Sequence, residues 1–492
     1  MTLSLRSSGA KLMVTVFAFG ACAYVTYRIG AQAYVGWCIK QSTKTSLDRA
    51  LALDPGNCGA EYRLGLYYSF VLTDLDLKRG QELLRTAVRC QPLDSQYWLA
   101  LAATLEASGD LPEAKAAAQK VSALESHNSV LLWRSGNLLL RMGELPEAFD
   151  LFHRVLEGAP EYLPLVFSTC WKSTGDGDLI LHRAVPDTVD SDLAYLDFLS
   201  LAQNLDLNAL QTAWGRSTGS EQEEPTGKNF DQVSALIRSK GTPEEIHAWD
   251  KSVKAALQPR LDEAEKVWDR LLALGEEFDP KKSFNFFQSL LEADRPQEAV
   301  KAWDKLVARG ILPRREQHLS NDLIVNGGFE AEPINGGLDW RIYPVGGVLV
   351  TNDRENRVEG GRSLSVHFEG LRNLDFKHVS QFVPVKPNTV YYFSAFLKSR
   401  ALSTLSGPHF EIYDYWDDRR DERTGERKVS WKTAEVLGDT EWTKYQLTIH
   451  TGPKTDLLVV SLRRQPALEL DKRIQGTMWV DDVRLSTIPD TE

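Results

Sequence analysis

Residues 109–114 read GDLPEA, and residues 143–148, which come 34 positions later, read GELPEA. Small residues such as Ala114 and Ala148 stand where two helices can touch, and the larger Phe152 stands where successive units can stack. Pro160 follows at a point where a helix must stop, because proline cannot continue the hydrogen-bonded ladder. A fixed period of this length predicts helical hairpins that stack on one another around a continuous core.

The repeat extends in both directions from these two copies. An earlier unit starts near Cys58 with an interhelix loop, residues 73–77, about three residues longer than the others, and residues 262–271 match residues 297–306 farther along the chain. Together these repeats resemble the tetratricopeptide family. The resemblance implies an all-α solenoid with a concave surface for a protein partner. We divide it into repeats at 42–170, degenerate helical hairpins with a polar loop (215–228) at 171–245, and further repeats at 246–315.

The N-terminus is strongly apolar. Residues 12–27 contain no charge, and the apolar character resumes at residues 29–39 after a single Arg28. A helix of about 20 residues crosses the hydrocarbon core of a bilayer, so we interpret residues 12–39 as a single transmembrane helix. Basic residues within 1–11 predict a cytoplasmic stub there, with the remaining domains on the periplasmic side of the inner membrane. A cleaved signal peptide or a lipoprotein signal ending at Cys22 is the alternative.

At about residue 320 the pattern changes from helical periodicity to short alternating runs. Examples are residues 363–368, 390–396 and 457–462, separated by turn-rich pieces, and such runs predict an antiparallel β-sandwich. The segment opens with LIVNGGFE at 323–330 and closes with MWVDDVRL at 478–485. With Trp340 between them, these strings resemble the carbohydrate-binding modules of the galactose-binding jelly-roll type over residues 321–487. The expected fold class is therefore multidomain: a transmembrane helix, an all-α solenoid and a C-terminal all-β jelly roll.

The resemblance also implies a structural calcium ion between the first segment and the last strand. Carried onto this chain, its ligands would be Glu330, Asp482 and nearby backbone carbonyls, and such hard oxygen ligands suit Ca²⁺. The alternative is that Glu330 belongs to a surface turn and Asp482 to a strand end, each with water as its partner.

Sugar recognition needs flat aromatic faces that lie against the ring. Four aromatic residues flank a charged excursion at 417–428 and are our candidates for a glycan platform: Tyr413, Tyr415, Trp416 and Trp431. We expect Trp340, Trp442 and Trp479 in the sandwich core, and the alternative for the four candidates is that they belong to the core as well.

The five cysteines form no C-x-x-C pair. Cys58 and Cys90 stand at the start of the first helix and the end of the second helix of one repeat, where antiparallel packing brings them together. A disulfide is a reasonable expectation there in an oxidising compartment, and two buried free thiols are the alternative.

The chain carries 57 Lys and Arg against 68 Asp and Glu, a formal charge of −11, which argues against nucleic acid as a partner. It contains no G-x-S-x-G, no H-E-x-x-H and no phosphate-binding glycine loop, so we expect no enzyme. The architecture resembles bacterial envelope proteins of polysaccharide assembly or export, which implies a non-catalytic scaffold with a protein partner and a polysaccharide ligand. The alternatives are a pure assembly scaffold, and a glycan-active enzyme whose acids, such as Glu411 and Asp414, meet in space.

Overall fold

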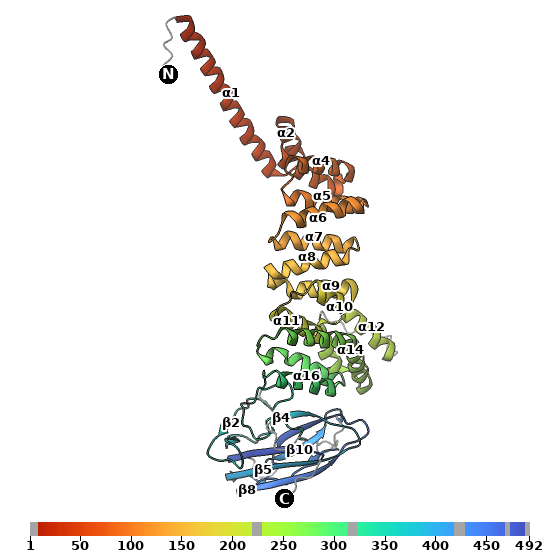
Figure 1. Ribbon diagram of the computed structural model, residues 1–492, viewed down its shortest axis with the longest axis vertical. Helices are drawn as coiled ribbons and strands as arrows, with labels where there is room; N and C mark the ends of the chain where they lie inside the picture. Colours follow the sequence, from red (N-terminus) through yellow and green to blue (C-terminus); the bar gives the residue numbers. More distant parts are fainter. Residues whose placement is uncertain (1–7, 219–228, 313–321, 418–428, 468–472, 488–492) are drawn as a thin grey trace. The chain divides into compact units, whose positions relative to one another are not determined.

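The computed structural model describes residues 8–218, 229–312, 322–417, 429–467 and 473–487, with side chains from residue 12 onward. The chain forms two compact units, Met1–Pro186 and Asp187–Glu492. The N-terminal unit contains the apolar helix and the first helical hairpins (Figure 1). The C-terminal unit contains the remaining helices and the β-sandwich. The predicted multidomain fold class is confirmed.

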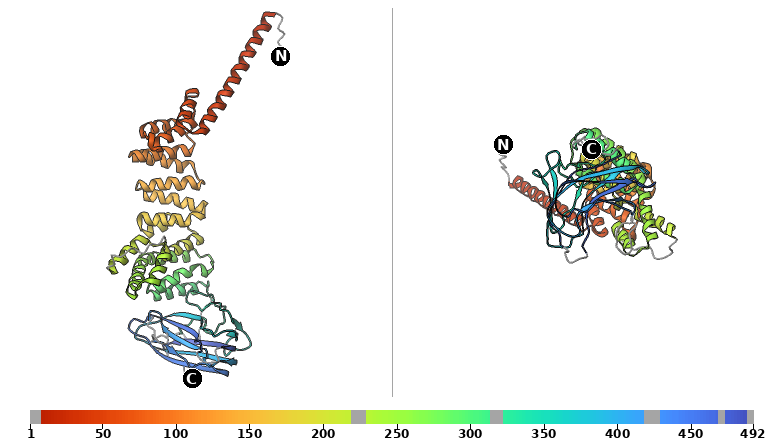
Figure 2. Two further views of the ribbon diagram at one scale, coloured as in Figure 1. Left: turned by 180° about the vertical axis from the view of Figure 1, so that it is seen from behind. Right: turned by 90° about the horizontal axis from the view of Figure 1, so that it is seen from below.

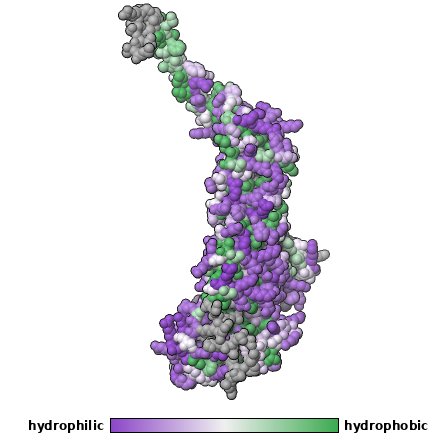
Figure 3. Space-filling view, viewed as in Figure 1, coloured by the Kyte–Doolittle hydropathy of each residue, from purple (hydrophilic) through white to green (hydrophobic). Residues whose placement is uncertain are grey.

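Helix α1 (Ser8–Gln41) is long and apolar enough over Leu12–Gln41 to cross a membrane, although a signal sequence near the N-terminus has the same features. Its most apolar window is entirely exposed, and Figure 3 shows a largely apolar surface over this helix where the hairpins that follow are mainly polar. Near its C-terminal end Val35 and Cys38 are buried against Ala50 of α2 (Lys44–Leu53). The end of α1 is therefore packed onto the first helix of the solenoid.

Four consecutive pairs of helices follow in the N-terminal unit, and alanines meet where the two helices of a hairpin cross. Ala114, Ala118 and Ala148 are completely buried, as the repeat pattern predicts. The longer interhelix loop contains a short 3₁₀ turn, Leu72–Asp74. The helices of this part are α3 (Cys58–Phe70), α4 (Leu77–Cys90), α5 (Ser95–Ser108), α6 (Leu111–Leu124), α7 (Ser129–Arg141), α8 (Leu145–Gly158), α9 (Leu163–Thr174) and α10 (Gly177–Arg183).

The helices of the C-terminal unit are less regular. The long helix α14 contains Pro259, and next to it the buried Arg260 donates hydrogen bonds to the carbonyl oxygens of Phe198 and Asn204 at 2.6 and 2.7 Å. The boundary that we placed at residue 245 falls inside this helix. The helices are α11 (Val189–Ser200), α12 (Leu207–Thr218), α13 (Phe230–Lys240), α14 (Pro243–Leu274), α15 (Phe284–Glu292) and α16 (Pro296–Ala308).

The prediction of a polar loop at 215–228 is wrong for its first four residues. Helix α12 continues through Thr218, and the remaining residues of that stretch, 219–228, lie outside the described residues.

Within the described residues, the sandwich consists of two five-stranded antiparallel sheets, ordered β1-β4-β9-β6-β7 and β2-β3-β10-β5-β8. Strand β4 of the first sheet contacts α16, and β5, β8 and β10 of the second sheet lie farther from the helices in two views (Figures 1 and 2). The strands are β1 (Arg341–Ile342), β2 (Val348–Asp353), β3 (Ser363–Glu369), β4 (Phe376–Pro384), β5 (Val390–Ser403), β6 (His409–Asp414), β7 (Trp431–Lys432), β8 (Gly438–His450), β9 (Leu457–Arg464) and β10 (Gln475–Ser486).

The sandwich core contains Trp340, as expected, and its ring packs on Phe329 in a tilted arrangement with 5.3 Å between the ring centroids. Trp479 is buried outside the central cluster, where its indole N–H donates to Asp353 at 2.7 Å. The expectation for Trp442 is wrong, because its side chain is partly exposed on β8, a strand at the edge of its sheet. Alternation along an edge strand does not decide which of its faces is covered.

Candidate functional site

A groove of about 440 Å³ runs across three successive first helices of the N-terminal unit, α3, α5 and α7. The spacing of the α-helix explains why these residues share one face, since side chains three and four positions apart lie one above the other. The lining residues are Tyr62, Leu66, Phe70, Gln96, Leu99, Ala100, Ala103, Trp133, Arg134, Asn137, Leu138 and Arg141.

Aromatic contacts hold two of the three aromatic rings of the groove, Tyr62 and Trp133, in place. Tyr62 stacks on Tyr97 with 4.4 Å between ring centroids, and burial raises the pKa of its hydroxyl. Trp133 packs on Phe152 of α8 at 4.9 Å. Both rings are partly exposed, so each presents a face to the groove that is already fixed by a neighbour.

Cations are the only charged groups among the described residues that line the groove. Arg134 is exposed on α7. Arg141, two helical turns later on the same helix, donates two hydrogen bonds to the carboxylate of Glu106 on α5, at 2.9 and 3.3 Å. The groove therefore changes along its length from an apolar wall on α3 to a cationic wall on α7.

The four aromatic residues predicted as a glycan platform do not form one surface. Trp416 follows the end of β6 and meets α14, where the Lys254 ammonium lies 3.5 Å from the centre of its ring. Its indole N–H donates to Asp456 at 3.0 Å, and Lys254 also pairs with Asp294 at 2.9 Å. This ring is thus part of the contact between the sandwich and the helices of the same unit.

Tyr415 lies in the same contact. Its ring meets Phe382 of β4 at 5.3 Å and Trp416 at 4.7 Å, and burial raises the pKa of its hydroxyl to about 12. The guanidinium of Arg341 stacks over Phe382 at 4.2 Å and donates to Gln288 of α15 at 3.1 Å. The outer face of the first sheet is therefore packed against helices at this point.

Tyr413 and Trp431 are placed differently. Tyr413 is partly exposed on β6, opposite Val459 of β9. Trp431 lies on β7, opposite Ile412 of β6, and packs against the sandwich core. Of the four candidates, Tyr413 is partly exposed and is not a member of the core cluster. Their role in ligand binding stays a prediction.

A second cavity, of about 380 Å³, lies where α16 meets the start of the sandwich, and both predicted calcium ligands line it. Glu330 accepts hydrogen bonds from the backbone N–H groups of Gly361 and Arg362 at 2.6 and 3.0 Å, and Asp482 pairs with Arg484 at 2.6 Å. Among the residues that the structure describes, no group of three acidic, His or Cys side chains is arranged to hold a metal ion. Both carboxylates are engaged by protein groups, and the calcium ion, which would also take backbone carbonyl ligands, stays a prediction.

Other acids of this cavity also serve as hydrogen-bond acceptors for loops. Asp322 accepts the N–H groups of Ile324 and Leu485, each at 3.0 Å, and burial raises the pKa of its carboxyl to about 6. These bonds tie the entry of the sandwich to its last strand.

The two acids that we considered for catalysis are engaged by neighbours. Asp414 accepts hydrogen bonds from the Thr455 hydroxyl at 2.5 Å and from the backbone N–H of Trp416 at 2.9 Å. Glu411 is buried and lies 3.7 Å from the cationic groups of Lys432 and Arg463.

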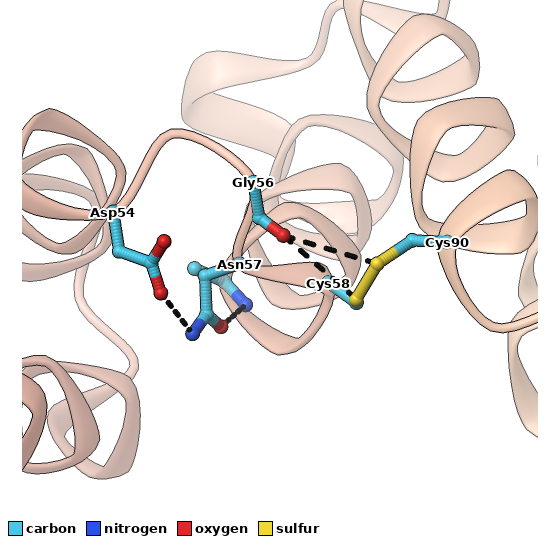
Figure 4. The surroundings of a disulfide bond; sticks show 6 residues. Asp54, Gly56, Asn57, Cys58 and Cys90 are labelled. Atoms are coloured by element: carbon cyan, nitrogen blue, oxygen red, sulfur yellow. Dashed lines mark hydrogen bonds between the residues drawn. A yellow bond between two sulfur atoms is a disulfide. The ribbon is translucent and has the colours of Figure 1, made fainter.

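Cys58 and Cys90 are joined by a disulfide, with 5.9 Å between their Cα atoms (Figure 4). The bond links the first turn of α3 to the last turn of α4, and the carbonyl oxygen of Gly56 lies 3.9 and 3.8 Å from the two sulfurs. Asn57 caps α3 by accepting the N–H of Ala60 at 3.1 Å. The two cysteines thus lie at the start of the first helix and the end of the second helix of one repeat, as expected, and they form the disulfide.

No family model matches the chain, and no curated protein is similar to it at a significant level. Solved structures with partial similarity include MamA (17% identity, 29% of this chain and 82% of that chain, TM-score 0.25). They also include PilF of Pseudomonas aeruginosa (15%, 45% and 99%, TM-score 0.28). A third is the CBM22-1 xylan-binding domain of Xyn10C from Paenibacillus barcinonensis (21%, 34% and 94%, TM-score 0.23). These similarities carry no functional argument.

Sequence reasoning missed the groove residues, although the period contains a signal for them. Leu99 and Trp133 are 34 positions apart, and so are Ala103 and Asn137. Following one lining position through successive repeats would have found this face. It would not have found Lys254 and Arg341, which depend on how the sandwich packs against α14 and α15.

Proposed function

We propose that this chain is a non-catalytic, membrane-anchored scaffold of the bacterial envelope that holds a segment of a partner protein in the groove of α3, α5 and α7. The groove carries the proposal, because it combines fixed aromatic faces, apolar walls and a few charged groups, as ligand-binding clefts do. Helix α1 supplies the anchor in the inner membrane, and the domains that follow lie in the periplasm. The process served is polysaccharide assembly or export.

A finer part of the proposal is that the sandwich binds a glycan. It is supported by the sequence strings that resemble carbohydrate-binding modules and by the partial exposure of Tyr413 on the first sheet. The engagement of Glu411 and Asp414 with neighbouring side chains supports a non-catalytic role over a glycan-active enzyme.

A second candidate function is favoured by the contacts of Trp416 and Tyr415. Both rings pack toward the helices of their own unit, so the sandwich would serve as a cap of the solenoid and an assembly surface, without a sugar ligand. Tethering on one membrane helix raises the effective concentration of partners in either case.

The protein-binding proposal is tested by a photo-cross-linking amino acid placed at Ala103, inside the groove, in the producing cell. The control places it at Ala107, one turn farther on α5, exposed and outside the groove. We expect defined adducts from position 103 only. Identical adducts from both positions, or none from 103 in a folded chain, would refute the groove as the binding surface.

The glycan proposal is tested with the full chain in lipid nanodiscs on an array of bacterial polysaccharides, with and without a chelator. We expect binding that falls at least tenfold in Tyr413→Ala and remains in the control Trp442→Ala, on an edge of the other sheet. Absence of binding by the folded chain would favour the capping function. Loss of binding with chelator would bring back the calcium ion.

A further inference from the structure

We infer that the groove of α3, α5 and α7 selects acidic peptide segments that also carry an apolar side chain. The inference rests on the proposed function, in which the groove holds a segment of a partner protein. It adds the chemical class of that segment and the direction in which its charged and apolar parts lie.

The charge of the lining points to an anionic partner. Arg134 and Arg141 are the charged residues of the described lining, although the whole chain has a formal charge of −11. Arg134 is exposed, and no hydrogen bond or ion pair holds its guanidinium within the described part of the chain. Arg141 gives its Nε and one terminal nitrogen to Glu106 and keeps the N–H groups of the other nitrogen for a further acceptor.

The spacing of the two arginines sets the spacing of the partner's acids. They are seven residues apart on α7, which corresponds to about 10 Å along the helix axis. An extended peptide rises about 3.3 Å per residue and points every second side chain to the same face, so two carboxylates two or four residues apart, at about 7 or 13 Å, can face the pair. Guanidinium groups bind carboxylates with two parallel hydrogen bonds, which favours Asp and Glu over hydroxyl or amide side chains.

The opposite wall favours an apolar side chain. Tyr62, Leu66 and Phe70 follow one another along α3 at intervals of four residues, and Phe70 is 51% exposed. Between the walls, Ala100 and Ala103 are small and leave the room that the groove occupies. An exposed phenylalanine beside such a space gains free energy when a leucine or aromatic side chain covers it.

The two walls together separate a peptide from an acidic polysaccharide. A polyuronate carries a charge on its sugar rings and no apolar side chain that could cover Phe70 and Leu66. We therefore assign the groove to a peptide, and binding of an acidic polysaccharide is an outcome that would overturn the assignment.

The experiment is a selection from a display library of random twelve-residue peptides on the full-length protein in nanodiscs. Peptides are kept when they bind wild type and the control Ala107→Trp but not Ala103→Trp, which fills the groove. The same selection is repeated on Arg134→Glu and on Arg79→Glu, an exposed site on α4 outside the groove. Circular dichroism confirms that each variant is folded.

We expect groove-dependent peptides with an excess of Asp and Glu and at least one large apolar residue. Arg134→Glu should weaken individual acidic peptides at least tenfold and shift the selected pool toward Lys and Arg, a reversal that loss of folding cannot produce. Arg79→Glu should leave the pool unchanged, and raised salt should weaken acidic peptides.

Other results distinguish a failure of this inference from a failure of the proposed protein-binding function. Groove-dependent peptides without an acidic excess, or an acidic pool that Arg134→Glu leaves unchanged, would overturn the inference and leave the proposed function standing. Competition by oligogalacturonate as strong as that of the peptides would also overturn it. A selection that yields no groove-dependent peptide would count against both.

Discussion

Asp339 is a buried carboxylate at the point where the chain enters the sandwich. It is only 4% exposed, accepts the N–H of Ile334 at 2.9 Å and that of Trp340 at 2.7 Å, and so fixes the loop before β1. Burial raises the pKa of its carboxyl to about 6, above the value near 4 that an unfolded chain has. Between these two pH values the folded state binds the proton more tightly than the unfolded state does.

The free energy of unfolding contributed by Asp339 therefore falls as the pH rises from about 4 to about 6, and is constant above that. Asp339→Asn is neutral throughout, so the stability of wild type relative to this variant should drop by about 2 kcal/mol between pH 4.5 and pH 7.5. Urea unfolding at both pH values, followed by tryptophan fluorescence, measures the difference. Glu369→Gln, at an exposed position of β3, is the control, and a constant difference for Asp339→Asn would contradict the assignment.

At the scale of elements, glycines set how closely the two helices of a hairpin approach. A Cβ atom at Gly136 of α7 would lie 2.5 Å from a ring atom of Phe152 on α8, and one at Gly65 of α3 would lie 2.7 Å from Leu84 on α4. Contacts this short force the neighbour to move. The close crossing is thus built into the repeat at equivalent places.

Gly136→Ala should lower the free energy of unfolding by about 1–3 kcal/mol, because Phe152 is fully buried and cannot swing away. Thermal unfolding followed by helical circular dichroism measures this. The matched control is Gly59→Ala in α3, where the new Cβ has its nearest neighbour at 3.5 Å, so the loss of backbone entropy in the unfolded state should make it neutral or stabilising by up to about 1 kcal/mol. Equal destabilisation by both changes would refute the crossing argument.

The elements that sequence predicts best are those whose repeat or alternation is local. The 34-residue period predicts the hairpins from α5 to α8, because each pair buries the same alanines. Alternation in the β region predicts which residues share a face of the sheet, but not whether helices cover that face. This is why Tyr415 and Trp416, plausible as an open platform, are placed against other parts of the same unit.

At the scale of the whole molecule, the disulfide bears on which side of the membrane the repeats lie. Disulfides persist in oxidising compartments, and Cys58–Cys90 follows α1 by fewer than twenty residues. Among the described cysteines, Cys22, Cys38 and Cys170 are free. The chain therefore carries its own reporter of topology.

In cells treated with a maleimide-polyethylene glycol after denaturation, we expect Cys58 and Cys90 to react only when a reductant precedes the reagent. Cys58→Ser with Cys90→Ser is the control and should show no such step. The free energy of unfolding of this double variant should also fall by about 3–4 kcal/mol, because the unfolded chain gains entropy when a loop spanning 32 residues is no longer closed. Immediate reaction of all five cysteines would place the repeats in the cytoplasm.

The packing of Trp416 on Lys254 decides where the chain can be cut for further work. A fragment that starts at residue 321 would uncover Trp416 and Arg341, because their partners Lys254 on α14 and Gln288 on α15 would be missing. Such a fragment would expose an aromatic surface patch on its first sheet and would aggregate more readily than the intact unit. Expression boundaries for crystallisation or ligand screening should therefore be drawn near Asp187, so that the helices and the sandwich are produced together.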